Sequence, residues 1–208
     1  LNRSERTVER QIETDRQQEV ALQTYLDRMA ELLLDEDLQT TKKESVRNLA
    51  RARTLTVLRG LNPERKRMVL LFLWEAGLID KGKPIVVLAG ADFSSADLRG
   101  VQLMMPVHGL GIDSPTFQAA DLEGADLTNA DLSGANLREI NLGHAILVDA
   151  NLSNASLANA FLQGAILVRA KLHNAYMASA NLRGAKLLLA DLTGANLFEA
   201  NIAGVLVT

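Results

Sequence analysis

Histidine and cysteine, which often carry catalysis or bind metals, are scarce in this chain. It has no cysteine and three histidines, His108, His144 and His173. The absence of cysteine excludes disulfides, cysteine-ligated zinc and thiol catalysis. His144 and His173 lie 29 residues apart, and three histidines supply little material for a metal site. We therefore expect no metal site and interpret the histidines as ordinary surface residues.

Aspartate is the other residue type that could carry chemistry, as paired carboxylates for acid–base catalysis. In the second half of the chain, however, aspartates recur beside alanine, as in the Ala-Asp-Leu tripeptides at 120–122 and 125–127. Aspartates that recur at a fixed position of a repeat are expected to have a structural role. They are not expected to face each other across a catalytic cleft. The chain also lacks a glycine-rich phosphate loop and a nucleophile motif. We predict no catalytic residues, no cofactor and no enzymatic activity.

The recurrence is an internal repeat with a period of five residues. Of the seventeen positions 120, 125, 130 and so on to 200, sixteen are alanine and Ile140 is the exception. A larger apolar residue, usually leucine, follows two positions after each of them. Earlier copies stand at 86–88, 91–93, 96–98 and 101–103.

The phase of the repeat slips between Leu103 and Phe117. Residues 104–114 contain one proline and two glycines, which favour turns over regular structure. We therefore predict an inserted loop at about 104–114.

A five-residue period fits neither a helix, at 3.6 residues per turn, nor a strand, at two. It fits a chain that turns a corner every five residues. Leucine would then fill the centre of the coil, and alanine would occupy positions where the neighbouring backbone leaves no room for a larger side chain. Four sides then close a coil of 20 residues, which stacks on the next at about 4.8 Å. The segment Ala-Ile-Leu-Val at 145–148 returns at 165–168, which independently supports a 20-residue coil.

The pattern Ala-(Asp/Asn)-Leu-x-x resembles that of the pentapeptide-repeat family. The resemblance covers residues 86–208 and implies a right-handed quadrilateral β-helix. We thus expect a mainly β fold in which this solenoid follows an N-terminal α-helical region at 1–85. The repeated residues build the coil, so the motif is specific for the fold and uninformative about the function.

The N-terminal region lacks the five-residue period. Residues 4–34 and about 43–60 carry apolar residues at helical spacing. A third predicted helix has clear ends, with Asn62 as N-cap, Pro63 at its first position and Gly77 as its stop.

The third helix contains the longest apolar run of the chain, Met68 to Trp74. This run is too continuous for an exposed helix and is predicted to be buried. A bare terminal coil exposes its core and its unpaired backbone groups. We therefore predict that residues 63–79 cap the N-terminal end of the β-helix. The alternative is an independently folded helical domain.

The segments at 50–55 and 62–66 resemble the extramembrane part of certain pentapeptide-repeat proteins of photosynthetic bacteria, in which a hydrophobic anchor precedes such helices. The resemblance implies a membrane tether upstream of residue 1, on the cytoplasmic face of a bacterial membrane. The seven-residue run at 68–74 is far shorter than the roughly 20 residues that a span needs. Residues 2–19 would form a stalk; the alternative is a solvated helix whose acidic side chains nearly cancel its arginines.

One side of the predicted coil is apolar on its outside. If Leu147, Leu167 and Leu187 point inward, their neighbours along the strand point outward. These outward residues, hereafter the aliphatic face, are Ile146, Val148, Ile166, Val168, Leu188 and Leu189. An exposed apolar patch usually marks a contact surface, covered by a helix of this chain, a dimer mate or another protein. The alternative is that β-branched residues simply suit a sheet.

A second candidate surface lies at the C-terminal end, where the sequence stops in repeat register without an amphipathic helix. Its unpaired backbone groups would form a template for association. We expect a homodimer through this coil, as the resemblance implies; the rival is a chain truncated from a longer protein. The predicted C-terminal layer consists of Leu192, Leu197, Ile202 and Val207.

The charge distribution bears on nucleic-acid mimicry. Residues 86–149 carry nine acidic and two basic side chains, whereas residues 150–208 carry two acidic and four basic ones. A mimic of DNA needs negative charge along its whole length, so nucleic acid is not the expected partner. We predict a non-catalytic protein–protein interaction or scaffold protein. A DNA-mimicking inhibitor of a type II topoisomerase is the alternative.

Overall fold

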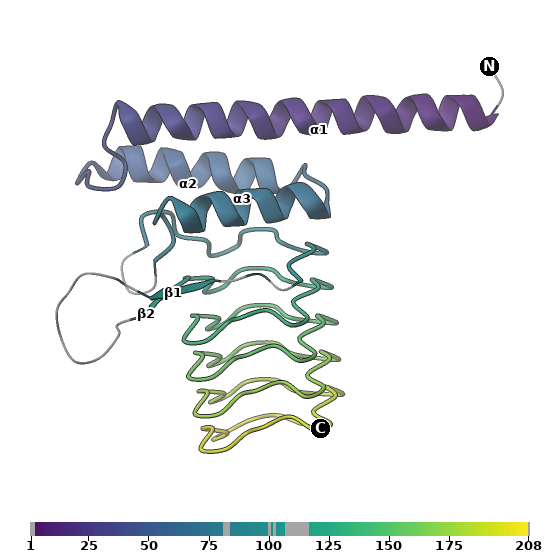
Figure 1. Ribbon diagram of the computed structural model, residues 1–208, viewed down its shortest axis with the longest axis vertical. Helices are drawn as coiled ribbons and strands as arrows, with labels where there is room; N and C mark the ends of the chain where they lie inside the picture. The colour runs from purple at the N-terminus through teal and green to yellow at the C-terminus, as the bar shows by residue number, and fades with distance from the viewer. Residues whose placement is uncertain (1–2, 81–83, 100, 102, 107–116, 208) are drawn as a thin grey trace.

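The computed structural model describes residues 3–80, 84–99, 101, 103–106 and 117–207. Figure 1 shows a rod of stacked coils with a helical layer on its N-terminal end. The helices are α1 (Arg3–Leu34), α2 (Glu44–Leu58) and α3 (Pro63–Glu75). Helices α2 and α3 lie next to the first coil, and α1 crosses above them.

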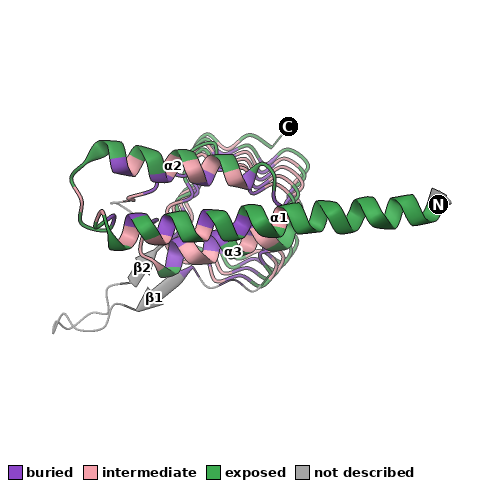
Figure 2. Cartoon of the chain, turned by 90° about the horizontal axis from the view of Figure 1, so that it is seen from above, coloured by how far each residue is buried: buried purple, intermediate pink, exposed green. Residues whose placement is uncertain are grey.

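Only the C-terminal half of α1 contributes to the core. Its buried residues recur at three- and four-residue intervals, which places them on one face of the helix; they are Leu22, Tyr25, Met29 and Leu32. The N-terminal half projects beyond the body and is exposed on every side (Figure 2). Val20, an apolar residue at helical spacing in the sequence, is 58% exposed because it lies two residues before buried Leu22 and therefore on another face of the helix.

Helix α3 has the predicted ends. The Asn62 side-chain oxygen accepts a hydrogen bond from the backbone N–H of Arg65 at 3.0 Å. Gly77 adopts a φ of 64°, a left-handed conformation that glycine tolerates and that stops the helix. Burial of the 68–74 run is confirmed for most of it but was wrong for Met68. Met68 is 52% exposed because it points away from the coil, one residue before buried Val69 and Leu70.

The rod is a β-helix whose coils repeat every 20 residues. Isolated parallel bridges join each residue of the set 121, 126, 131 and 136 to the residue 20 positions later. Each coil therefore carries four ladders that continue into the next coil. The alanines at every fifth position from Ala120 to Ala185, and the central residues from Leu122 to Leu182, are no more than 1% exposed, so they form the core of the rod.

The corner of each repeat uses the left-handed backbone conformation. It falls two residues after the central apolar residue, for example at Asn129 with a φ of 58°. Glycine, asparagine and aspartate tolerate this conformation best. Their frequency at this position in the repeat is therefore a consequence of the corner.

The register changes at the predicted insertion. Asp92 bridges Asp126, which lies 34 positions later and not 20. The additional residues include an antiparallel pair of short strands, β1 (Met104–Pro106) and β2 (Phe117–Ala119). The first three residues of the predicted loop at 104–114 are therefore strand β1, and the rest of that loop lies outside the described residues.

The helical layer is joined to the rod by charged side chains. Lys66, only 5% exposed, donates to the Asp92 carboxylate at 2.9 Å and to the Ser94 carbonyl oxygen at 3.0 Å. Arg51 of α2 donates to the carbonyl oxygens of Val87 and Ala89, each at 3.0 Å. These contacts satisfy carbonyl groups and a carboxylate of the first coil.

Candidate functional site

Several aspartate side chains of the repeat accept hydrogen bonds from the backbone of the turns that follow them. Asp126 Oδ1 accepts a hydrogen bond from the backbone N–H two residues later, at 2.9 Å, and Asp131 does the same at 3.1 Å. Asn141 and Asn151 make the equivalent bond with their side-chain oxygens. Where the turn has a side-chain acceptor, that acceptor is an oxygen atom whose charge is not needed, which explains why both aspartate and asparagine occur at this position.

The carboxyl groups that the structure perturbs all favour the ionised form. Hydrogen bonds from the side chain and backbone of Thr193 lower the pKa of Asp191. The hydrogen bond from Arg169 lowers the pKa of Asp149. A general acid at neutral pH needs a raised pKa instead. Neither group therefore has the electrostatic environment that such a role requires.

The histidines are separate from one another where they are described. His144 occupies a left-handed corner with a φ of 57°, and both His144 and His173 are exposed. His108 lies outside the described residues. Within the described ranges, no group of three or more histidine, aspartate or glutamate side chains is arranged to hold a metal ion.

The six residues of the aliphatic face lie on the outside of the rod. Ile146 bridges Ile166, which in turn bridges Lys186, so these three residues form one ladder. Ile146, Val148, Ile166 and Val168 are half-buried, whereas Leu188 is 39% and Leu189 73% exposed. The described helices stack on the N-terminal end of the rod, and none of them lies over this face (Figure 1). No helix among the described residues therefore covers the face.

Two features of this face were not predicted. Asp149 and Arg169 form an ion pair at its corner, with Arg169 Nε 2.7 Å from Asp149 Oδ1. Their 20-residue spacing was a usable sequence signal, because equivalent corners stack. Leu189 also adopts the left-handed conformation, with a φ of 58°, in spite of its large side chain.

The C-terminal layer is more exposed than the layers above it. Leu192 and Leu197 are half-buried, and Ile202 and Val207 are 58% and 59% exposed. Phe198, at an outward position of the same end, is 68% exposed. Phe198 was not predicted, because the predicted C-terminal layer contained only inward-pointing residues.

Two hollows in the described part of the chain are lined by residues of the helical layer. One groove of about 470 Å³ runs between α1 and α2 and is lined mainly by apolar atoms, including Ala21, Tyr25 and Val57. The hydroxyl group of Tyr25, which lines this groove, shares a hydrogen bond of 3.0 Å with the buried hydroxyl group of Thr54. No described helix is long and apolar enough to cross a membrane.

The comparisons with known proteins identify the repeat. A family model for pentapeptide repeats matches eight copies within residues 116–205. No curated protein is significantly similar in sequence. Among solved structures, the chain is 32% identical to the pentapeptide-repeat protein Rfr23 from the cyanobacterium Cyanothece 51142. That match covers 55% of this chain and 90% of Rfr23, with a TM-score of 0.24.

Two proteins of Nostoc are also similar. HetL, a pentapeptide-repeat protein involved in heterocyst differentiation regulation, is 37% identical over 58% of this chain and 52% of HetL, with a TM-score of 0.31. The protein alr5209 is 26% identical over 68% of this chain and 94% of its own length, with a TM-score of 0.31. From the family model and the sequence identity over nearly all of Rfr23, the chain belongs to the pentapeptide-repeat family.

Proposed function

We propose that this protein is a non-catalytic scaffold that binds a protein partner through the aliphatic face. The observation that carries the proposal is the aliphatic face itself, with Ile146, Ile166 and Leu188 on successive coils of a rod whose repeat aspartates and asparagines accept turn hydrogen bonds. Full burial of one such side chain contributes about 1.5–3 kcal/mol. A few of them are sufficient for a specific contact.

The test replaces Ile146 and Ile166 together by aspartate. Each change restores the Ala-Asp-Leu tripeptide of the repeat, so the coil is expected to fold normally. A matched control, Ser156→Asp with Asn181→Asp, adds the same charge at equivalent ladder positions on other sides of the rod.

The experiment is affinity capture from cell extract, followed by mass spectrometry. Proteins captured by the wild type and the control, and lost with the Ile146→Asp/Ile166→Asp variant, are the expected result. Identical captures by all three proteins would show that the face has no role in binding.

Mimicry of DNA is the competing function, because residues 86–149 carry a net charge of −7. The remaining coils carry +2, so the negative potential ends halfway along the rod, unlike that of a duplex. We expect no effect in a gyrase supercoiling assay. Inhibition at low micromolar protein would favour the topoisomerase inhibitor over the scaffold.

In its finer geometry, we propose that the β-helix is right-handed and four-sided. The four ladders in each 20-residue coil support four sides. We also propose domain limits of 1–85 and 86–208, with residues 63–79 as the N-terminal cap. The contacts of Lys66 with Asp92 and of Arg51 with Val87 support this capping role and extend it to α2.

The C-terminal layer is the proposed site of a homodimer. The exposure of Ile202 and Val207 supports an apolar contact at this end. A two-fold axis would bring the same layer of both copies together. A membrane tether upstream of residue 1 stays a prediction.

A further inference from the structure

The aliphatic face carries opposite charges at its two ends. Its first ladder runs from Asp92 to Leu206, and the four residues in the middle of that ladder are Asp126, Ile146, Ile166 and Lys186, each bridged to the next coil. Asp126 comes from the acidic half of the rod and Lys186 from the basic half. Among the described residues, neither side chain forms an ion pair. Asp126 Oδ1 accepts the turn hydrogen bond from Thr128, but no opposite charge of the described chain neutralises it. The order acid, aliphatic, aliphatic, base can therefore meet opposite charges on a partner.

This order is self-complementary. A two-fold axis along the strand direction, halfway between Ile146 and Ile166, reverses the rod axis and keeps each residue in its own ladder. It places Ile146 opposite the partner's Ile166 and Asp126 opposite the partner's Lys186. We propose that two copies of this chain associate side by side and antiparallel through the aliphatic face. This proposal rests on the proposed function and names its partner.

The neighbouring columns obey the same symmetry. In the second column, which runs through 128, 148, 168 and 188, Val148 faces the partner's Val168. At the corner, Asp149 and Arg169 are already paired within one chain. The axis places this pair against the same pair in reversed order, so that four charges of alternating sign meet.

A parallel arrangement lacks this complementarity. Its two-fold axis would run along the rod and place Asp126 opposite the partner's Thr128. The Asp126 and Lys186 charges would then have no opposite charge across the interface. Charge complementarity orients partners in this way and suppresses the wrong register.

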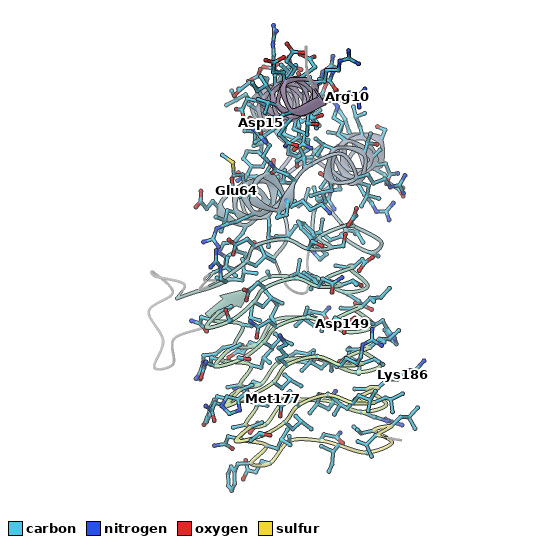
Figure 3. The ribbon with its side chains drawn as sticks, turned by 90° about the vertical axis from the view of Figure 1, so that its right-hand side faces the viewer. Arg10, Asp15, Glu64, Asp149, Met177 and Lys186 are labelled. Atoms are coloured by element: carbon cyan, nitrogen blue, oxygen red, sulfur yellow. The ribbon has the colours of Figure 1, made fainter. Side chains whose placement is uncertain are left out.

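The surroundings of the face leave room for a second rod. Asp149 and Lys186 lie along one edge in Figure 3, whereas α1 is seen end-on above the rod and does not extend past that edge. The face spans few coils at about 4.8 Å each, which is small for an obligate interface. The expected dimer is therefore reversible and concentration-dependent.

The test uses charge exchange between ladders. Lys186→Asp alone places like charges opposite each other, and so does Asp126→Lys alone. Each variant is expected to weaken self-association in sedimentation velocity by about tenfold or more. An equimolar mixture of the two single variants restores opposite charges at both contacts and should associate as well as the wild type. Failure of the mixture to associate would overturn the proposed pairing.

Crosslinking tests the direction of the pair, because the chain has no cysteine of its own. Thr128→Cys mixed with Leu188→Cys should form a disulfide-linked dimer under mild oxidation, and neither variant alone should do so. A crosslinked dimer of either variant alone, or no crosslinked dimer in the mixture, would exclude the antiparallel arrangement.

The outcomes separate this inference from the proposed function. If the wild type is monomeric at every concentration while Ile146→Asp/Ile166→Asp still abolishes partner capture, the self-pairing is wrong and the scaffold proposal stands. If capture is also unchanged, both proposals fail.

Discussion

At the scale of single residues, the repeat has positions that the coil constrains and positions whose side chains can vary without disturbing the coil. Alanine and leucine fill the core, aspartate and asparagine accept the turn hydrogen bond, and glycine or asparagine forms the corner. Functional signal is therefore concentrated in departures from these rules. Ile146 and Ile166 replace the turn acceptor by an aliphatic side chain, and Leu189 replaces the preferred corner residue.

Leu189 gives a residue-scale prediction. A left-handed backbone disfavours a residue with a large side chain by about 1–2 kcal/mol, and asparagine tolerates it better. Because Leu189 is 73% exposed, its side chain recovers little by packing. Leu189→Asn is thus expected to raise the free energy of unfolding by about 1 kcal/mol. Urea denaturation followed by circular dichroism measures it.

The matched control is the reverse change in the same column of corners. Asn129 has the same φ of 58°, so Asn129→Leu should destabilise the protein by a similar amount. If Leu189→Asn were destabilising while Asn129→Leu was neutral, the corner conformation would not be the cause.

The features that could be predicted best from the sequence are those of the repeat. The 20-residue recurrence predicted the ladders between coils, and Asn62 was correctly predicted as an N-cap. Burial of Met68 was wrong, because a continuous apolar run does not say which face of the helix points to the coil. The Lys66–Asp92 contact was not predicted, since it joins non-repeating elements through a geometry that no spacing records.

At the scale of elements, the joint between α3 and the first coil combines burial with charge. The Lys66 side chain is 6% and that of Asp92 31% exposed. Burial raises the pKa of Asp92, but the hydrogen bonds from Lys66 and Ser94 outweigh it, and the net pKa lies below 3.8. Asp92 therefore stays ionised throughout the neutral range.

Removing the carboxylate tests this joint. Asp92→Asn leaves the buried ammonium of Lys66 without a counter-ion, and breaking such a pair costs about 3 kcal/mol of unfolding free energy. Replacement of both residues, Lys66→Met with Asp92→Asn, should recover most of the loss. Urea denaturation of the three proteins measures both effects. A single variant as stable as the wild type would mean that the pair does not hold α3 to the coil.

The same pair predicts an acid dependence. The pKa of Asp92 is lower in the folded than in the unfolded state, so its contribution is fully present above about pH 4. It is lost as the pH falls through the lower folded value. The stability difference between wild type and Asp92→Asn should accordingly shrink in acid and stay constant from pH 5 to pH 8, in roughly the range where Asp92 remains ionised.

At the scale of the whole molecule, the rod is asymmetric in both its ends and its charge. The N-terminal end is covered by α2 and α3, and the C-terminal layer exposes Ile202 and Val207. Net charge changes from −7 in residues 86–149 to +2 in residues 150–208. Because the two halves of the rod have opposite net charge, contacts along its side favour an antiparallel partner. The exposed C-terminal layer instead favours a contact between the C-terminal ends of two copies.

These two contacts are independent, because one lies on the side of the rod and the other at its end. Each is isologous, so each alone closes at a dimer. Both together join dimer to dimer, and the wild type should form species larger than dimers as its concentration rises. Ile202→Arg removes the end contact and Ile146→Asp/Ile166→Asp the side contact. Each of these variants should therefore stop at a dimer in sedimentation equilibrium, and their combination should be a monomer. A wild type that never exceeds a dimer, and that Ile202→Arg leaves unchanged, would exclude the end-to-end contact and retain only the side-by-side pair.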